Sequence, residues 1–259
     1  MKVCAVIPAA GRGTRLGLPV PKILAPIRED LTVWSVLRDS LIPIVERVVV
    51  VLSPSGVRLF QNALASDIAK ARISVEVQKR PVGMGDAVFT ALPVWQEFES
   101  ILIVWGDQVN VSKSTIRATL ADHEAHRAGC TIPVVRIPNP YVQYDWDAAG
   151  RLTRIRQTRE KDEVDANGFS DVGIFALSTN GLKEAWQDYI LTCRKGSLTN
   201  EVNFLPFLVF LSARGWPIRL LLAQYTTEAM GINTPADFAT ARRRFAHWKP
   251  AVLDLVEHR

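Results

Sequence analysis

Short, continuous apolar segments alternate along the chain with longer segments whose apolar positions follow helical spacing. A continuous apolar segment of this length is typical of a strand buried on both faces of a sheet. Such segments predict strands at 2–7, 45–52, 101–105, 130–137, 171–177 and 218–223. Helical spacing predicts helices at 32–41, from 53 onward, and at 82–95, 112–128, 205–214 and 238–245. The alternation predicts βαβ crossovers, and so an α/β fold with a Rossmann-like, doubly wound and mostly parallel sheet.

The domain organisation follows from how this alternation changes along the chain. It is regular up to about residue 110 and looser after Gly129, and no Ser/Gly linker, low-complexity segment or internal repeat divides the sequence. We therefore predict a single domain over 1–259 with two lobes. The lobe at 1–110 is expected to contain a nucleotide-type sheet, and the lobe at 111–259 to form the other wall of a pocket.

Composition narrows the classes of protein. Hydrophobic residues make up 48% of the chain and charged residues 22%, which is typical of a globular protein. The apolar segments are too short to cross a bilayer, so no membrane partner is expected. The formal net charge of +5 is mild, and Arg242–Arg244 are expected to be solvated on a helix face, so we predict no nucleic-acid partner. Three cysteines without close spacing indicate a reducing compartment, and we predict a cytoplasmic protein; the oligomeric state stays open.

The loop at 8–17 is the most informative segment. It leaves the first strand at its C-terminal end, where open α/β sheets bind ligands. Residues without bulky side chains would let backbone N–H groups approach an anion there: Ala9, Ala10, Gly11 and Gly13. Cationic residues follow in or just after the loop: Arg12, Arg15 and Lys22. A cationic, glycine-containing loop at the end of a strand predicts a polyphosphate site.

Other interpretations of this loop are weaker. A dinucleotide-binding fingerprint requires GxGxxG leading directly into a helix, whereas this loop has GxGxxxG followed by Pro19 and Pro21. A Walker A loop requires GxxxxGK[ST], which the sequence lacks. A glycine-rich surface turn with solvated arginines is the alternative without a function.

The loop also resembles a known family. The sequence Ala-Ala-Gly-Arg-Gly-Thr-Arg-Leu at 9–16, with Pro21 and Lys22, is similar to the signature of nucleotidyltransferases that join an NTP to a sugar 1-phosphate. These enzymes include the N-terminal domain of N-acetylglucosamine-1-phosphate uridyltransferase and belong to the MobA-like NTP transferase superfamily. Further segments resemble the family in order: Gln78 with 83–87, then 103–107, 160–162, 171–174 and 231–235. The resemblance implies the nucleotide-diphospho-sugar transferase fold.

The resemblance implies roles for individual residues. Arg15, Lys22 and Asp107 would be catalytic, with Arg15 at the departing pyrophosphate and Lys22 bridging the α-phosphate and the acceptor phosphate. The nucleotide would be bound by Ala9, Ala10, Gly11, Gly13, Thr14, Gln78, Gly83 and Met84. The acceptor would be bound by Trp105, Glu160, Asp171 and Gly173. The Mg²⁺ cofactor would be held by Asp107 and Asn233.

The chemistry of these residue types fits those roles, although simpler explanations exist. Asp107 ends a strand opposite the predicted phosphate loop, where a carboxylate suits Mg²⁺. The structural alternative is that Asp107 caps the next helix, although Ser112 could also be that cap. Asn233 rests on the resemblance, and an Asn before Thr-Pro is also a common turn residue. The amide of Gln78 offers a donor and an acceptor, which suits a pyrimidine. Asp171 stands where the family has Asn, and its added charge would favour a cationic acceptor group.

The resemblance implies a Mg²⁺-dependent nucleotidyltransferase that uses an NTP, with UTP favoured, and a phosphorylated small-molecule acceptor, a sugar 1-phosphate. A phosphate oxygen attacks the α-phosphorus, pyrophosphate leaves and an NDP-sugar forms. Because the nucleophile is already ionised near neutral pH, catalysis reduces to alignment and charge neutralisation. One alternative is a cytidylyltransferase acting on phosphocholine, a phosphonate or another small phosphate. Another is a catalytically silent nucleotide sensor.

Overall fold

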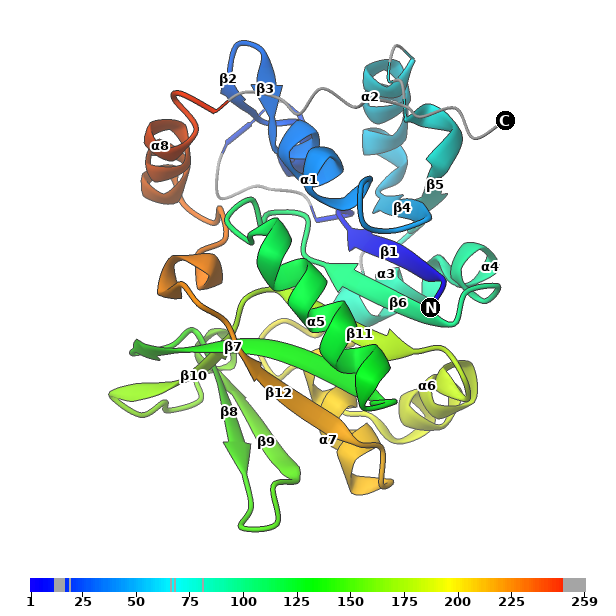
Figure 1. The fold of residues 1–259 in the computed structure, drawn as a ribbon, viewed down its shortest axis with the longest axis vertical. Helices are drawn as coiled ribbons and strands as arrows, with labels where there is room; N and C mark the ends of the chain where they lie inside the picture. Colours follow the sequence, from blue (N-terminus) through cyan, green and yellow to red (C-terminus); the bar gives the residue numbers. More distant parts are fainter. Residues whose placement is uncertain (12–16, 19, 66, 68, 81, 249–259) are drawn as a thin grey trace.

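A mixed sheet of eight strands runs through the molecule (Figure 1). The computed structural model describes residues 1–11, 17–18, 20–65, 67, 69–80 and 82–248. One half of the sheet is entirely parallel, in the order β6-β1-β4-β5. Its strands are β1 (Val3–Pro8), β4 (Arg47–Leu52), β5 (Ile73–Val77) and β6 (Ser100–Val104). Strands β1, β4 and β6 match the strands predicted from the first apolar segments, and the parallel arrangement brings the carboxyl ends of β1 and β6 to the same edge.

The other half of the sheet is mixed in direction. Its strands are β7 (Cys130–Pro138), β10 (Asn167–Asp171), β11 (Ile174–Ser178) and β12 (Ile218–Leu222). Strand β11 is antiparallel to both β6 and β7, while β12 is parallel to β7. The predicted strand at 171–177 is in fact split into β10 and β11. Gly173 interrupts it with φ of 77°, and a Cβ built there would lie 2.3 Å from the Gln108 side chain.

Helices cover both faces of the sheet, as a doubly wound fold requires. Alternate residues of β1 belong to different cores: Val3, Ala5 and Ile7 to one, Cys4 and Val6 to the other. The first core is covered by α1 (Val33–Leu41), α2 (Pro54–Leu64), α5 (Lys113–Ala125) and α8 (Pro235–Arg244). The second is covered by α3 (Met84–Thr90), α4 (Leu92–Trp95), α6 (Leu182–Thr192) and α7 (Leu205–Ala213).

Several elements differ from the predictions. The helix predicted at 82–95 is two helices, α3 and α4, because Pro93 has no N–H to continue the first one. Two hairpins were not predicted: β2 (Pro26–Arg28) with β3 (Leu31–Thr32), and β8 (Val142–Trp146) with β9 (Leu152–Gln157). The β8–β9 hairpin lies beside α7 at the lower end of Figure 1. The two lobes divided near residue 110 stay a prediction.

Every helix in the described part of the chain falls short of the length and apolarity that a bilayer crossing requires.

Candidate active site

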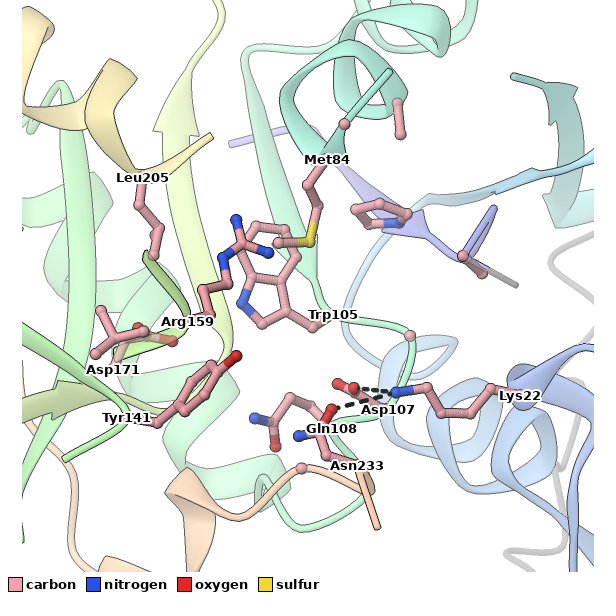
Figure 2. Close-up of a pocket in the computed structure, with 18 of the residues that line it drawn as sticks. Lys22, Met84, Trp105, Asp107, Gln108, Tyr141, Arg159, Asp171, Leu205 and Asn233 are labelled. Atoms are coloured by element: carbon pink, nitrogen blue, oxygen red, sulfur yellow. Dashed lines mark hydrogen bonds and ion pairs between the residues drawn. The ribbon is translucent and has the colours of Figure 1, made fainter. Parts of the chain in front are cut away.

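A cavity of about 380 Å³ opens at the carboxyl ends of β1 and β6 (Figure 2). This volume is in the range of small-molecule sites, and the position is where ligands bind in open α/β sheets. Its walls come from segments distant in the sequence: 8–11, 22–23, 78, 83–87, 105–108, 141–142, 157–159, 170–171, 201–205 and 229–233. The cavity therefore brings together most of the segments predicted to form the site.

Lys22 lies at the centre of a polar cluster on one side of the cavity. Its Nζ donates to Asp107 Oδ2 at 2.6 Å, to the Ile232 carbonyl at 2.9 Å and to Asn233 Oδ1 at 3.4 Å. The two acceptor segments are joined directly, because the Ile232 N–H donates to the Asp107 carbonyl at 3.1 Å. Three residues predicted to act together thus lie in contact.

Neither Asp107 nor Asn233 serves as a helix cap. Ser112 caps α5 by accepting from the Thr115 N–H, so Asp107 is not needed as a cap. Thr234 caps α8 and forms a capping box with Asp237. The side chains of Asp107 and Asn233 are therefore free of capping duties and line the cavity.

The chemistry of this cluster fits a Mg²⁺ ion. Asp107 and Asn233 supply hard oxygen ligands. One oxygen of each already accepts a hydrogen bond from a positively charged group, the Lys22 ammonium. Nearby, Gln108 Oε1 is buried and accepts no hydrogen bond from any residue the structure describes. Within those residues no group of three or more His, Cys, Asp or Glu side chains is placed to hold a metal. This donor set suits an ion that is shared with phosphates and water rather than held in an all-protein cage.

On the nucleotide side, the amide of Gln78 has a fixed orientation. Its Nε2 donates to the Gly83 carbonyl at 2.9 Å and to Asp86 Oδ2 at 2.8 Å. Both partners accept hydrogen bonds, so the amide must turn its NH₂ toward them. Gln78 Oε1 is the atom left to meet a ligand. Met84, the first residue of α3, also points into the cavity (Figure 2).

Gly83 is required by the protein itself. Its φ is 133°, and a Cβ built there would lie 2.5 Å from the Val202 carbonyl oxygen. Val202 is bonded on both sides of this turn: its N–H donates to the Val82 carbonyl at 2.7 Å, and its carbonyl accepts from the Gly85 N–H at 3.2 Å. The start of α3 is thereby fixed against the segment that carries Glu201 and Leu205 to the cavity.

On the predicted acceptor side, Trp105 and Asp171 line the cavity, whereas Gly173 is not among the residues that line it. Trp105 packs against Phe175 and Phe204 with ring centroids 5.0 and 5.7 Å away. Asp171 is 8% exposed and accepts from the Tyr144 hydroxyl at 3.0 Å and from the Gly173 N–H at 2.7 Å. Burial raises the pKa of Asp171 above its ordinary value. Its oxygens are thus partly used by the protein, with Gly173 acting as a backbone donor.

Glu160 does not line this cavity, contrary to its predicted role. Its carboxylate accepts from the Leu198 N–H at 2.9 Å, from Thr199 Oγ1 at 2.7 Å and from Asn203 Nδ2 at 3.4 Å. These hydrogen bonds, the Leu198 one above all, lower the pKa of Glu160 to about 2. The 3₁₀ turn Thr158–Glu160 turns about 120° per residue, so the neighbouring Arg159 faces the cavity instead.

Several cavity residues were not predicted from the sequence: Gln108, Tyr141, Gln157, Arg159, Glu201 and Leu205. Tyr141 and Gln157 come from the β8–β9 hairpin and its margins, which were not predicted. Four residues of the predicted phosphate loop, Arg12, Gly13, Thr14 and Arg15, lie outside the described residues. Their roles stay predictions.

Comparison with known proteins supports this description. The bifunctional protein GlmU of Carboxydothermus hydrogenoformans is 28% identical over 244 residues, covering 90% of this chain and 51% of that protein. GlmU of Acidithiobacillus ferrooxidans is 27% identical over 255 residues, covering 96% and 53%. The chain therefore spans about half the length of the curated relatives it matches. The crystal structure of HddC from Yersinia pseudotuberculosis has the same fold, with a TM-score of 0.68 at 18% identity, over 93% of this chain and 99% of HddC.

A family model gives the assignment. The model of the MobA-like NTP transferase domain matches residues 5–170. This range contains β1, the loop after it, and the cavity residues Lys22, Gln78 and Asp107. The chain belongs to the MobA-like NTP transferase domain family.

Proposed function

We propose that this NTP transferase moves a nucleotidyl group from an NTP, with UTP favoured, to a sugar 1-phosphate, releasing pyrophosphate and forming an NDP-sugar. The observation that carries the proposal is the contact of Lys22 with both Asp107 and Asn233 in the cavity at the end of β1. A cation and hard oxygen ligands at this edge of the sheet suit a bound polyphosphate.

The residues of the cavity divide into two working sides. Met84 lies toward the nucleotide side, and Asp171 and Leu205 lie on the opposite side of Trp105 (Figure 2). An acceptor bound beside Asp171 would direct its phosphate toward Lys22, between the two sides. The phosphate monoester is already ionised at neutral pH, so the protein's task is to align it with the α-phosphorus.

Charge neutralisation is the second task. Lys22 would stabilise the negative charge that develops on the phosphates as the new bond forms. Mg²⁺ bound at Asp107 and Asn233 would supply further positive charge to the phosphate oxygens. Lys22 then has no need to neutralise Asp107, and its ammonium can turn to the acceptor phosphate.

The orientation of Gln78 supports a uracil base. Its free Oε1 accepts a hydrogen bond, and uracil presents the N3–H donor where cytosine presents an unprotonated nitrogen. Thymine shares this donor, so the amide alone does not separate the two.

The cytidylyltransferase alternative for a cationic acceptor has less support. It would need an open anionic site, but both oxygens of Asp171 already accept hydrogen bonds, from Tyr144 and Gly173. Arg159, a cation, lines the same cavity.

Pyrophosphate release tests the proposal. ATP, CTP, GTP and UTP would each be assayed with glucose 1-phosphate, N-acetylglucosamine 1-phosphate and phosphocholine in the presence of Mg²⁺. We expect the highest kcat/KM with UTP and a sugar 1-phosphate. Turnover confined to CTP and phosphocholine would support the cytidylyltransferase instead. Nucleotide binding without pyrophosphate from any acceptor would indicate a silent sensor.

A further inference from the structure

Arg159 is held in a defined orientation on the acceptor side of the cavity. Its side chain is 20% exposed and points into the cavity (Figure 2). Its Nε donates to Gln157 Oε1 at 3.2 Å, and its Nη2 donates to Asn203 Oδ1. Gln157 and Asn203 are buried, at 4% and 3% exposure. A guanidinium held by two buried amides is a prepared binding group rather than a mobile surface side chain.

Glu160 explains why Asn203 presents its oxygen to Arg159. Asn203 Nδ2 donates to Glu160 Oε1 at 3.4 Å, which fixes the amide with its oxygen turned the other way. Glu160 is in turn fixed by the Leu198 N–H and by Thr199. The carboxylate first expected to bind the acceptor therefore positions Arg159 through Asn203.

The positive charge of Arg159 is only partly compensated by the described residues. Both of its hydrogen-bond acceptors are uncharged amides, and no carboxylate of the described residues accepts a hydrogen bond from it. Glu201 forms a long ion pair with Arg159, with Oε2 3.8 Å from Nη1, and the Glu201 side chain is 38% exposed. Arginine binds carboxylates and phosphates through paired N–H groups, so a largely buried arginine of this kind is suited to an anionic ligand.

We propose that Arg159 binds a second anionic group of the acceptor, a carboxylate or a phosphate other than the reacting one, so that the acceptor is an acidic sugar 1-phosphate. This proposal rests on the proposed function of the cavity. Lys22 lies beside Asp107, whereas Arg159 lies on the other side of Trp105, toward Asp171 and Leu205 (Figure 2). The two cations therefore serve different parts of a ligand. Glu201 Oε2 lies 3.8 Å from Arg159 Nη1, and the anionic group of the ligand would replace it beside the guanidinium.

The test compares acceptors that differ in one group. Glucose 1-phosphate, glucuronic acid 1-phosphate and glucose 1,6-bisphosphate would be assayed with UTP and Mg²⁺ by pyrophosphate release. We expect kcat/KM to be about 10- to 100-fold higher for one of the two charged acceptors, the size of a charge-assisted hydrogen-bonded pair. A preference for the uronic acid identifies a carboxylate, and a preference for the bisphosphate identifies a phosphate.

Variants then assign the preference to Arg159. Arg159→Gln should remove it: the ratio of kcat/KM for the charged acceptor over glucose 1-phosphate should fall to about one, through a higher KM for the charged acceptor. Glu201→Gln should lower KM for the charged acceptor, because the competing carboxylate is gone. Arg154→Gln is the matched control, since Arg154 lies on β9 with its side chain 62% exposed and outside the cavity.

The outcomes separate this proposal from the proposed function. Equal turnover of all three acceptors by the wild type would overturn the role of Arg159 and leave the nucleotidyl transfer standing. A fall of the same size for every acceptor in Arg159→Gln would overturn it too. If no acceptor releases pyrophosphate although UTP binds, the transfer itself is contradicted, and the role of Arg159 with it.

Discussion

Lys22 and Asp107 are joined by an ion pair of 2.6 Å although 85 residues separate them in the chain. Their side chains are 24% and 18% exposed, so the pair is partly shielded from water. It connects the segment after the phosphate loop to the end of β6, and through Asn233 it also reaches the segment before α8. The pair thus closes one wall of the cavity before any ligand enters.

Removing the charge of Lys22 should slow catalysis without unfolding the protein. We expect Lys22→Ala to lower kcat by about 100- to 1,000-fold, because a charge that stabilises the developing phosphate charge is lost. Steady-state pyrophosphate release measures the effect, and circular dichroism checks the fold. Lys183→Ala is the matched control, since Lys183 is exposed on α6. A kcat near that of wild type in Lys22→Ala would contradict the mechanism.

Asp86 should control the choice of base through Gln78. In Asp86→Asn the amide at 86 can donate as well as accept, so only the Gly83 carbonyl still holds the NH₂ of Gln78 in its present orientation. We expect the ratio of kcat/KM for UTP over CTP to fall by about tenfold, the scale of one hydrogen bond. Parallel assays with the two nucleotides measure this ratio. An unchanged ratio would show that Asp86 does not control the choice of base.

Gly83 should tolerate no side chain. Gly83→Ala places a Cβ 2.5 Å from the Val202 carbonyl oxygen at a φ of 133°, so the start of α3 must move. We expect a loss of about 2–4 kcal/mol in the free energy of unfolding, from backbone strain and overpacking together. Urea denaturation measures it. The control is Gly150→Ala, where φ is 75° but no atom lies within 4 Å of the added Cβ, and where about 1 kcal/mol is expected.

The carboxylate of Glu160 should stabilise the fold in a pH-dependent way. Its pKa is lowered from 4.5 to about 2, so the folded state binds this proton less readily than the unfolded state. The stabilisation is therefore full above pH 4.5 and is lost as the pH falls toward about 2. The difference in unfolding free energy between wild type and Glu160→Gln should be largest near neutral pH and shrink over this range. A difference that is constant with pH would contradict the assignment.

Strand positions and the edge of the sheet at which the cavity opens could be predicted from the sequence because both depend on local patterns. Buried parallel strands appear as continuous apolar segments, and β1, β4 and β6 follow from them directly. The sequence could group three of the site residues because each lies in a segment that resembles the family: Lys22, Asp107 and Asn233. Their contact then depends on the sheet bringing strand ends together.

The acceptor wall could not be predicted in the same way. The β8–β9 hairpin alternates weakly, and its burial depends on packing against α7, which no local pattern reveals. Arg159 rather than Glu160 faces the cavity because successive side chains of a single 3₁₀ turn point in different directions. The orientation of the Gln78 amide depends on Asp86, a partner eight residues away in another element.

The two hydrogen bonds of Val202 have a consequence for how the two substrates bind. They join the start of α3, where Met84 lies, to the segment that carries Glu201 and Leu205 to the cavity. A nucleotide bound against Met84 would therefore touch a turn that is already bonded to the segment on the other side of the cavity. We expect the acceptor to bind more tightly when the triphosphate is present, as measured by calorimetry of the acceptor with and without UTP.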